Sequence, residues 1–449
     1  MKFFRWQRGL RLVVAAAFCL AGSIASAQSN PAYMTFGVAK GLLYKPDNGP
    51  APHVGVLVMH RTADFLRHPA CTELSKRGFM VLCMNSRYEN NEVAVSFETL
   101  PLDVKAGVQA LRGQPGITKV LLFGHSGGGP LMSLYQAIAE TGPSYCQGPQ
   151  KLVQCSSDQL VNLPPADGII FADAHPGNAI LVLRALNPSV ANEDNPPATA
   201  PLAGLDPYNP RNGFNPNGPS HYSDTFRKAY FAAQSARMNK LIDSALDKVR
   251  RMKEGTYPYP DNDVMVIPRG GPQGSGPGAS AYLWITDPTV PEILQTTKPR
   301  KLVRNDGTID DSGIVKSVAV ADPGNGKRNM AFDTGTKLLS VRSFLSANAI
   351  RSRDSLLDID YCSSNNSTVC AVQSISAPTL FTAMGAYYFI GDNERMYQLS
   401  KSRDKEFYVI EGATHFFTPC ATCEPRKGAY SNSLRNLFDT IANWINQRF

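Results

Sequence analysis

The sequence has no long apolar run after its first 27 residues, no block of like charges and no internal repeat. A membrane-spanning helix needs roughly 20 consecutive apolar residues, and no later segment reaches that length. The 45 basic residues outnumber the 37 acidic ones, but the two signs are interspersed, so the basic composition is no argument for a nucleic-acid or membrane partner. We therefore expect a globular protein of enzyme size, with no nucleic-acid partner and no membrane anchor in its mature form.

Residues that could hold a metal ion are scattered along the chain. There are only seven histidines. The cysteine pair with zinc-like spacing, Cys420 and Cys423, lacks a second well-spaced pair of ligands. We therefore expect neither a metal site nor a cofactor.

The first 27 residues have the layout of a secretory signal peptide. Four basic residues without an acid precede an apolar run from Leu12 to Leu20, and the small residues Ala25-Ser26-Ala27 follow. We expect cleavage before Gln28 and export to the periplasm or beyond. Without the four basic residues of this segment, 41 basic and 37 acidic residues leave a formal charge of +4.

Export makes the cysteine count informative, because disulfides form in oxidising compartments. Eight cysteines remain after the predicted cleavage, an even number that favours pairing. Cys83 lies within the apolar run 79–84 and could equally be a buried strand thiol, so its pairing with Cys71 stays open. Three other pairs are close enough in sequence to clip local loops: Cys146–Cys155, Cys362–Cys370 and Cys420–Cys423.

Two parts of the chain, residues 28–175 and 375–449, alternate short β-rich apolar runs with helical patterns. The runs 54–59 and 119–123 are examples in the first part, and 406–410 is one in the second. Such a βαβα rhythm is typical of a largely parallel sheet covered by helices on both faces. The predicted fold class is therefore α/β.

The segment 176–374 interrupts this rhythm. Stretches rich in proline, glycine and asparagine at 195–219 and 268–280 predict long loops. They flank a strong helix, with Ser223 as its predicted N-cap and Gly255 as its predicted C-cap. We expect this insertion to form a cap over the site.

The strongest motif is the Gly-x-Ser-x-Gly sequence at 124–128, which follows an apolar run and precedes a helical pattern. A serine at a sharp turn from strand to helix is held in a strained conformation, and flanking glycines leave room for it. Its Oγ then projects clear of the sheet, while the Gly127 N–H and the helix N-terminus point toward developing negative charge. The motif predicts Ser126 as a nucleophile and Gly127 as an oxyanion-hole donor.

A serine hydroxyl is a poor nucleophile until a base takes its proton. The base should be a histidine far downstream, after the last strand, and His415 fits, because it follows the run 406–410 and precedes the final helical pattern. The other six histidines lie too early for this order, at positions 53, 60, 68, 125, 175 and 221.

Ser126 in its strand–turn–helix setting, the late His415 and the alternating pattern together resemble the α/β-hydrolase superfamily. The resemblance covers roughly residues 35–175 and 375–449. It implies an eight-stranded, mostly parallel sheet with helices on both faces and the site at the C-terminal ends of the strands.

The resemblance also implies an oxyanion hole built from two backbone N–H groups. One is that of Gly127. The second should come from the loop after the run 54–59, which begins His60-Arg61-Thr62. The family position corresponds to Thr62, and Arg61 is the alternative because it stands where the family usually has a glycine.

The acid that orients His415 has three candidates. The family usually places it as Gly-x-x-Asp after the penultimate strand, but here that loop has a tyrosine, Tyr388, at the acid position. Some members carry the acid after the preceding core strand, where this chain has Asp173 at the end of the run 168–172. We expect Asp173 first, then Glu394, then Asp392.

A serine at the elbow predicts hydrolysis of a carboxylic ester through an acyl-enzyme. The expected partner is a small-molecule or polymeric ester. Thioesters, lactones, amides and carbon–carbon bonds could be cleaved by the same residues. A non-catalytic binding protein on the same fold is the alternative from another class.

Overall fold

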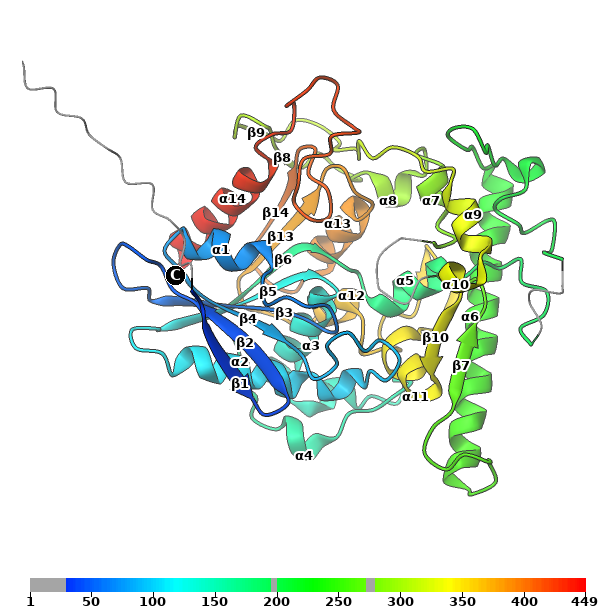
Figure 1. Ribbon diagram of the computed structural model, residues 1–449, viewed down its shortest axis with the longest axis horizontal. Coiled ribbons are helices and arrows are strands. Elements are labelled where there is room, and N and C mark those ends of the chain that lie inside the picture. Colours follow the sequence, from blue (N-terminus) through cyan, green and yellow to red (C-terminus); the bar gives the residue numbers. More distant parts are fainter. Residues whose placement is uncertain (1–29, 195–199, 272–278) are drawn as a thin grey trace, which may run out of the picture.

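The computed structural model describes residues 30–194, 200–271 and 279–449 (Figure 1). The predicted signal peptide, 1–27, lies outside these described residues, and so do parts of the two predicted loops, 195–199 and 272–278. Within the described ranges, no helix is both long and apolar enough to cross a membrane.

A ten-stranded sheet runs through the centre of the molecule (Figure 1). Neighbouring strands from β4 to β8 pair in parallel, whereas β1–β2, β2–β4 and β8–β9 pair antiparallel. In spatial order the strands are β1 (Ala32–Phe36), β2 (Ala39–Tyr44), β4 (Met80–Asn85), β3 (Val54–His60), β5 (Lys119–Ser126), β6 (Gly168–Ala174), β13 (Thr379–Met384), β14 (Lys405–Ile410), β8 (Lys301–Val303) and β9 (Ile309–Asp310).

The mostly parallel α/β sheet is confirmed, but it has ten strands where eight were expected. The two additional strands, β8 and β9, come from the segment 176–374. β8 pairs with β14 and covers the backbone groups of an otherwise open edge, which is a common way to protect an edge strand.

Helices cover both faces of the sheet, as the βαβα rhythm predicts. α1 (Pro69–Ser75) and α14 (Ser433–Arg448) pack on one face, whereas α2 (Pro101–Arg112), α3 (Gly128–Thr141) and α13 (Ile390–Leu399) pack on the other. All seven residues of β3 are buried, which explains its continuous apolar sequence. Val56 and Val58 join the core beneath α1 and α14, while Leu57 and Met59 join the core beneath α2 and α3.

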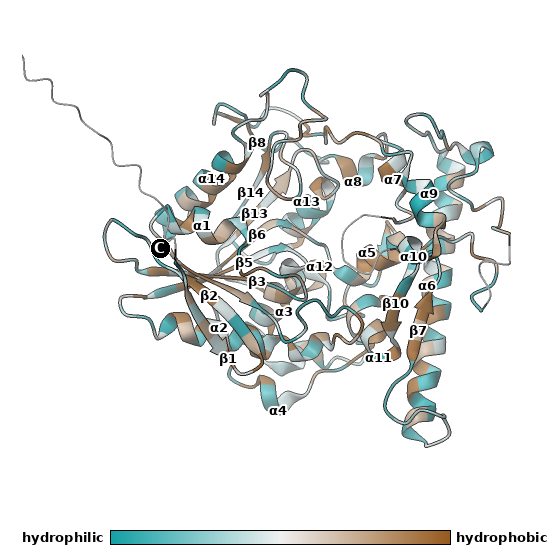
Figure 2. Ribbon diagram, in the orientation of Figure 1, coloured by the Kyte–Doolittle hydropathy of each residue, from teal (hydrophilic) through white to brown (hydrophobic). Residues whose placement is uncertain are grey.

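The segment 176–374 builds one side of the molecule. α5 (Asn178–Ala185) packs against α6 (Asp224–Lys253), the long helix at the right of Figure 1. The predicted N-cap is confirmed, because the Ser223 side chain accepts a hydrogen bond from Phe226 N–H. Hydrophobic and hydrophilic residues alternate along α6 in Figure 2, as expected for a helix with one docked and one solvated side.

Two small sheets and several short helices complete the fold. β7 (Val264–Ile267) pairs with β10 (Lys337–Ser340), and β11 (Ser352–Asp354) pairs with β12 (Asp358–Ile359). The remaining elements are η1 (Phe97–Thr99), η2 (Pro143–Cys146), α4 (Ser157–Leu160), η4 (Pro210–Asn212), α7 (Leu283–Thr286), α8 (Pro291–Leu294), α9 (Asn325–Met330), α10 (Phe332–Gly335), α11 (Val341–Ser343), η5 (Phe344–Asn348) and α12 (Thr368–Ala371).

The eight described cysteines form four disulfides. The three predicted local pairs are confirmed, including the one between Cys420 and Cys423, whose spacing resembles that of zinc ligands. The open pairing is also resolved, because Cys71 on α1 is bonded to Cys83 on β4. This bond fastens a surface helix to a central strand.

Candidate active site

The turn that carries Ser126 joins β5 directly to α3. Ser126 ends β5 with φ of 56°, a strained backbone conformation for a residue with a side chain. The turn is tight, because a Cβ on Gly124 would lie 2.8 Å from the Cα of Gly129. The sequence Gly-x-Ser-x-Gly thus allows α3 to start close to the strand end and leaves the Ser126 hydroxyl at the carboxyl edge of the sheet.

Ser126, His415 and Asp173 form a continuous line of hydrogen bonds. The Ser126 Oγ lies 2.9 Å from Nε2 of His415, and Nδ1 of His415 lies 2.6 Å from Oδ2 of Asp173. A carboxylate can only accept, so Nδ1 carries the imidazole proton and Nε2 is left to accept the Ser126 proton. The three residues come from the ends of β5 and β6 and from the loop after β14.

Asp173 is fully buried and is held by two donors. Besides His415, the backbone N–H of Met384 donates to Oδ1 at 3.1 Å. Burial raises the pKa of Asp173, and the two hydrogen bonds oppose that rise. The negative charge of a buried carboxylate needs hydrogen-bond donors to stabilise it. The ionised form of Asp173 is therefore more stable when the His415 imidazole faces it.

A second imidazole, that of His175, contacts the same hydroxyl. Nε2 of His175 lies 2.9 Å from the Ser126 Oγ. Because the single Ser126 proton is directed to His415, His175 must donate from Nε2. Its Nδ1 is then an acceptor, and it is buried without a hydrogen-bond partner among the described residues. Burial and the nearby His415 lower the pKa of His175 well below its usual value, so its ring is neutral.

Sequence reasoning missed His175 as a site residue. The backbone explains its position: the pairing of β5 with β6 shifts by one residue between His125 and Ser126, and Ser126 O then accepts from His175 N–H at 3.0 Å. The sequence feature that could have indicated His175 is its position two residues after Asp173, because both then lie at the same edge of the sheet.

Two further histidines fix the backbone of the loop that carries His415. Ala70 N–H donates to Nδ1 of His68, so His68 donates from Nε2 to Nδ1 of His125, 2.9 Å away. His125 in turn donates from Nε2 to the carbonyl oxygen of His415 at 2.8 Å. Burial lowers the pKa of His125 well below its usual value and that of His68 to about 3, which keeps this chain of donors neutral.

Aromatic rings set the orientation of both imidazoles. Tyr387 stacks on His415 with ring centroids 4.4 Å apart, and Phe389 meets His175 edge-on at 5.1 Å. These residues occupy the loop where the family usually has its acid. Their packing against the two histidines accounts for their presence near the site.

The other two acid candidates lie in ion pairs away from His415, so Glu394 and Asp392 are wrong as orienting acids. Glu394 accepts from Arg300 Nε at 2.6 Å and from Thr297 N–H. Asp392 binds the buried Arg184, with both carboxylate oxygens within 3.0 Å of one guanidinium nitrogen. An arginine already compensates the negative charge of each of these carboxylates, so neither is available to orient His415.

The predicted second oxyanion-hole donor also needs correction. The backbone N–H groups of Thr62 and Ala63 both donate to Nδ1 of His60, at 3.0 and 2.8 Å. The Thr62 N–H is therefore occupied within its own turn and is not free for a substrate. In contrast, no acceptor for the Gly127 N–H occurs in the described part of the chain, which leaves that group available.

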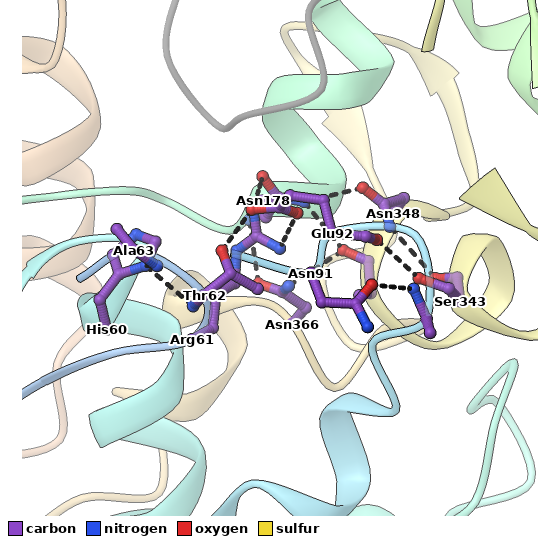
Figure 3. A network of polar contacts seen from close by, with 12 residues as sticks. His60, Arg61, Thr62, Ala63, Asn91, Glu92, Asn178, Ser343, Asn348 and Asn366 are labelled. Carbon is purple, nitrogen blue, oxygen red and sulfur yellow. Dashed lines mark hydrogen bonds and ion pairs between the residues drawn. The ribbon is translucent and has the colours of Figure 1, made fainter. Parts of the chain in front are cut away.

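Arg61, next to this turn, anchors the loop to the segment 176–374 (Figure 3). Its side chain is completely buried, with Nη1 2.6 Å from Glu92 and Nη2 3.1 Å from Asn178. Asn178 continues the network by donating to Asn348 at 2.9 Å. The arginine that replaces the family's glycine thus fixes the loop in place through its side chain.

A cavity of about 370 Å³ opens in front of Ser126. Its volume falls within the range of small-molecule sites. The lining comes from the two predicted core segments rather than from 176–374, and consists of His60, Thr62, Ala63, Phe65, Asn90, Glu92, His125, Ser126, His415 and Phe416.

No protein-family model matches the chain, and no curated protein matches it in sequence. Solved structures resemble it distantly. Est1E from Butyrivibrio proteoclasticus is 11% identical, with a TM-score of 0.37 and coverage of 94% of this chain and 99% of that one. A soluble variant of monoglyceride lipase from Saccharomyces cerevisiae is 12% identical, with a TM-score of 0.38 and coverage of 94% and 96%. Brefeldin A esterase, a bacterial homologue of human hormone sensitive lipase, is 10% identical, with a TM-score of 0.39 and coverage of 97% and 80%.

Likenesses this distant say nothing of substrate or activity. The chain's own architecture is more informative: a mostly parallel sheet with helices on both faces, a serine at the strained turn after β5, and an acid and a histidine brought to it from the ends of β6 and β14. With these features the chain has the fold of the α/β-hydrolase superfamily that its sequence resembles.

Proposed function

We propose that this protein is an exported serine hydrolase that cleaves a carboxylic ester through an acyl-enzyme. The observation that carries the proposal is the line of hydrogen bonds from Ser126 through His415 to the buried Asp173, at 2.9 and 2.6 Å. A nucleophile, a base and an orienting acid within hydrogen-bond reach are the requirement for this chemistry.

In the acylation step, His415 Nε2 takes the Ser126 proton while Oγ forms a bond to the ester carbonyl carbon. The carbonyl π electrons move to its oxygen, where the free Gly127 N–H stabilises the negative charge. Asp173 stabilises the imidazolium that forms. The intermediate collapses by breaking the bond to the alcohol oxygen, which takes the proton from His415 and leaves an acyl group on Ser126.

Deacylation repeats these steps with water. His415 removes a water proton, hydroxide bonds to the acyl carbon, and the Ser126 Oγ leaves with the proton that His415 returns. His175 acts here as a hydrogen-bond donor to Oγ, because its Nε2 lies 2.9 Å from that atom. It stabilises negative charge on Oγ both when the serine attacks and when it leaves.

The setting of the site supports a small-molecule ester as substrate and an exported location. The cavity of about 370 Å³ accommodates a compact acyl or alcohol group beside Ser126. Four disulfides suit an oxidising compartment. The predicted signal peptide agrees with that location.

The direct test is steady-state hydrolysis of a panel of p-nitrophenyl esters with acyl chains of two to twelve carbons, with Ser126→Ala as the matched control. We expect turnover by the wild type, strongest for the shorter chains, and none above background for the variant. Turnover of thioesters or lactones but not esters would redirect the proposal to another acyl substrate. A folded wild type that cleaves none of these compounds would favour the binding-protein alternative.

A further inference from the structure

The Thr62 N–H, the backbone donor that we expected for the oxyanion hole, is occupied, and the loop after β3 presents a side-chain donor beside it. Nδ1 of His60 accepts two backbone hydrogen bonds, from Thr62 and Ala63. A neutral imidazole that accepts on one nitrogen carries its proton on the other. The proton of His60 is therefore fixed on Nε2 by the turn itself.

The Nε2 edge of His60 lies against Gly127, the residue after the nucleophile. A Cβ on Gly127 would lie 2.5 Å from this nitrogen, so the imidazole could not occupy its position beside a residue with a side chain. His60 lines the same cavity as Ser126 and His415. Across the residues that the structure describes, Nε2 of His60 has no hydrogen-bond partner.

Neighbouring groups keep this imidazole neutral and in place. Burial, together with the adjacent Arg61 guanidinium, lowers the pKa of His60 well below its usual value. Phe65 packs on the ring with centroids 5.0 Å apart. A neutral N–H donor stabilises a developing oxyanion without taking part in the acid–base titration of the site.

We propose that the His60 side chain is the second oxyanion-hole donor, with Nε2–H directed at the same substrate oxygen as the Gly127 N–H. The inference rests on the proposed serine hydrolase function and deepens it. It assigns two roles to one imidazole, because Nδ1 shapes the turn while Nε2 contacts the substrate.

Two substitutions separate these roles. His60→Asn places a carboxamide oxygen near the position of Nδ1, where it can cap Thr62 and Ala63 N–H, but it has no atom at the position of Nε2. His60→Gln reaches the position of Nε2 with an amide N–H but cannot cap the turn in the same way. Steady-state kinetics on the best ester, pH profiles and thermal melting of wild type and both variants form the experiment.

We expect His60→Asn to lose about 10²- to 10³-fold in kcat with little change in KM, as for removal of one oxyanion-hole donor. Its melting temperature and the shape of its pH profile should match those of the wild type. His60→Gln should retain more kcat than His60→Asn although it disturbs the turn.

Three results would overturn the proposal. If His60→Asn keeps kcat within twofold of the wild type, a backbone N–H of the loop is the donor and the hydrolase function stands. If both variants lose kcat equally, His60 acts only through packing. If the wild type cleaves no ester and no fluorophosphonate labels Ser126, the proposed function itself fails, and this inference fails with it.

Discussion

Two imidazoles contact the hydroxyl of Ser126 at the same distance, 2.9 Å, and they differ in the hydrogen-bond partner of their other ring nitrogen, Nδ1. Nδ1 of His415 lies 2.6 Å from a buried carboxylate, that of Asp173. Nδ1 of His175 is buried and has no hydrogen-bond partner within the described structure. Asp173 would therefore stabilise a proton that His415 accepts during a reaction, whereas His175 has no such partner.

This difference supports the proposed roles, because proximity to the Ser126 hydroxyl alone does not make a histidine a base. A base needs a partner that stabilises its protonated form, and of these two imidazoles His415 has one. A neutral donor needs the opposite surroundings, and burial provides them for His175. The predictions below test this division of roles, from the largest expected effect to the smallest.

Removal of the base should have the largest effect. We expect His415→Ala to lower kcat by about 10⁴- to 10⁶-fold, as for loss of a member of such a hydrogen-bonded triad. His221→Ala, which alters an exposed histidine, is the control and should leave kcat unchanged. Ester hydrolysis at saturating substrate measures both. A loss below tenfold for His415→Ala would give the role of base to His175.

Removal of the Asp173 charge, which faces Nδ1 of His415, should have the next largest effect. Asp173→Asn keeps the shape of the side chain but can no longer stabilise the imidazolium, and we expect kcat to fall by about 10⁴-fold. Glu394→Gln is the matched control, because Glu394 is also buried but pairs with Arg300. It should destabilise the fold while kcat of the folded fraction stays at the wild-type value. Equal losses in kcat would contradict the assignment of Asp173.

The donor role of His175 should have a smaller effect. A hydrogen bond to a charged group contributes about 1.5–3 kcal/mol, so His175→Phe should lower kcat by about 10- to 100-fold. His175→Gln keeps an amide N–H for Oγ and should recover part of that loss. The pH at which the rate is half-maximal should not move in either variant, because His175 does not titrate in the working range. A shifted pH profile would show that His175 exchanges protons.

The neutral state of the buried histidines should also be visible in stability. Burial lowers the pKa of His175 and His125 well below the usual 6.5, and that of His68 to about 3. Between about 6.5 and those lowered pKa values the unfolded chain binds protons that the folded chain does not, so the free energy of unfolding falls as pH falls. Each such histidine adds a slope of about 1.4 kcal/mol per pH unit.

Denaturant titrations from pH 7 to pH 4 measure this slope. His68→Gln should reduce it, whereas His53→Gln, which changes an exposed histidine, should leave it as in the wild type. A slope that is unchanged by His68→Gln would mean that His68 is not held neutral in the folded state.

Local patterns made much of the site predictable. Ser126 could be proposed as the nucleophile because a strand, a glycine-flanked serine and a helix follow one another within a few residues. His415 and Asp173 follow strands that the apolar runs already indicate, and parallel strands bring their carboxyl ends to one edge. Glu394 is also a carboxylate near a strand end, but its partner Arg300 is 94 residues away in sequence, so no local signal indicated the ion pair.

The remaining features depend on contacts that no periodic pattern carries. His175 reaches Ser126 through a one-residue shift in the pairing of β5 and β6. The Thr62 N–H is occupied because the His60 side chain folds back onto its own turn. β8 and β9 have three and two residues, too few for an alternating apolar pattern to reveal them.

The most direct test of the central claim is covalent labelling with a fluorophosphonate, which reacts with serines that a neighbouring base activates. The purified mature protein is treated with the probe, and the adduct is located by intact mass and peptide mapping beside Ser126→Ala and Asp173→Asn. We predict one adduct per chain, on Ser126, absent from Ser126→Ala and formed far more slowly in Asp173→Asn. A folded wild type that stays unlabelled, or an adduct on another residue, would contradict the account.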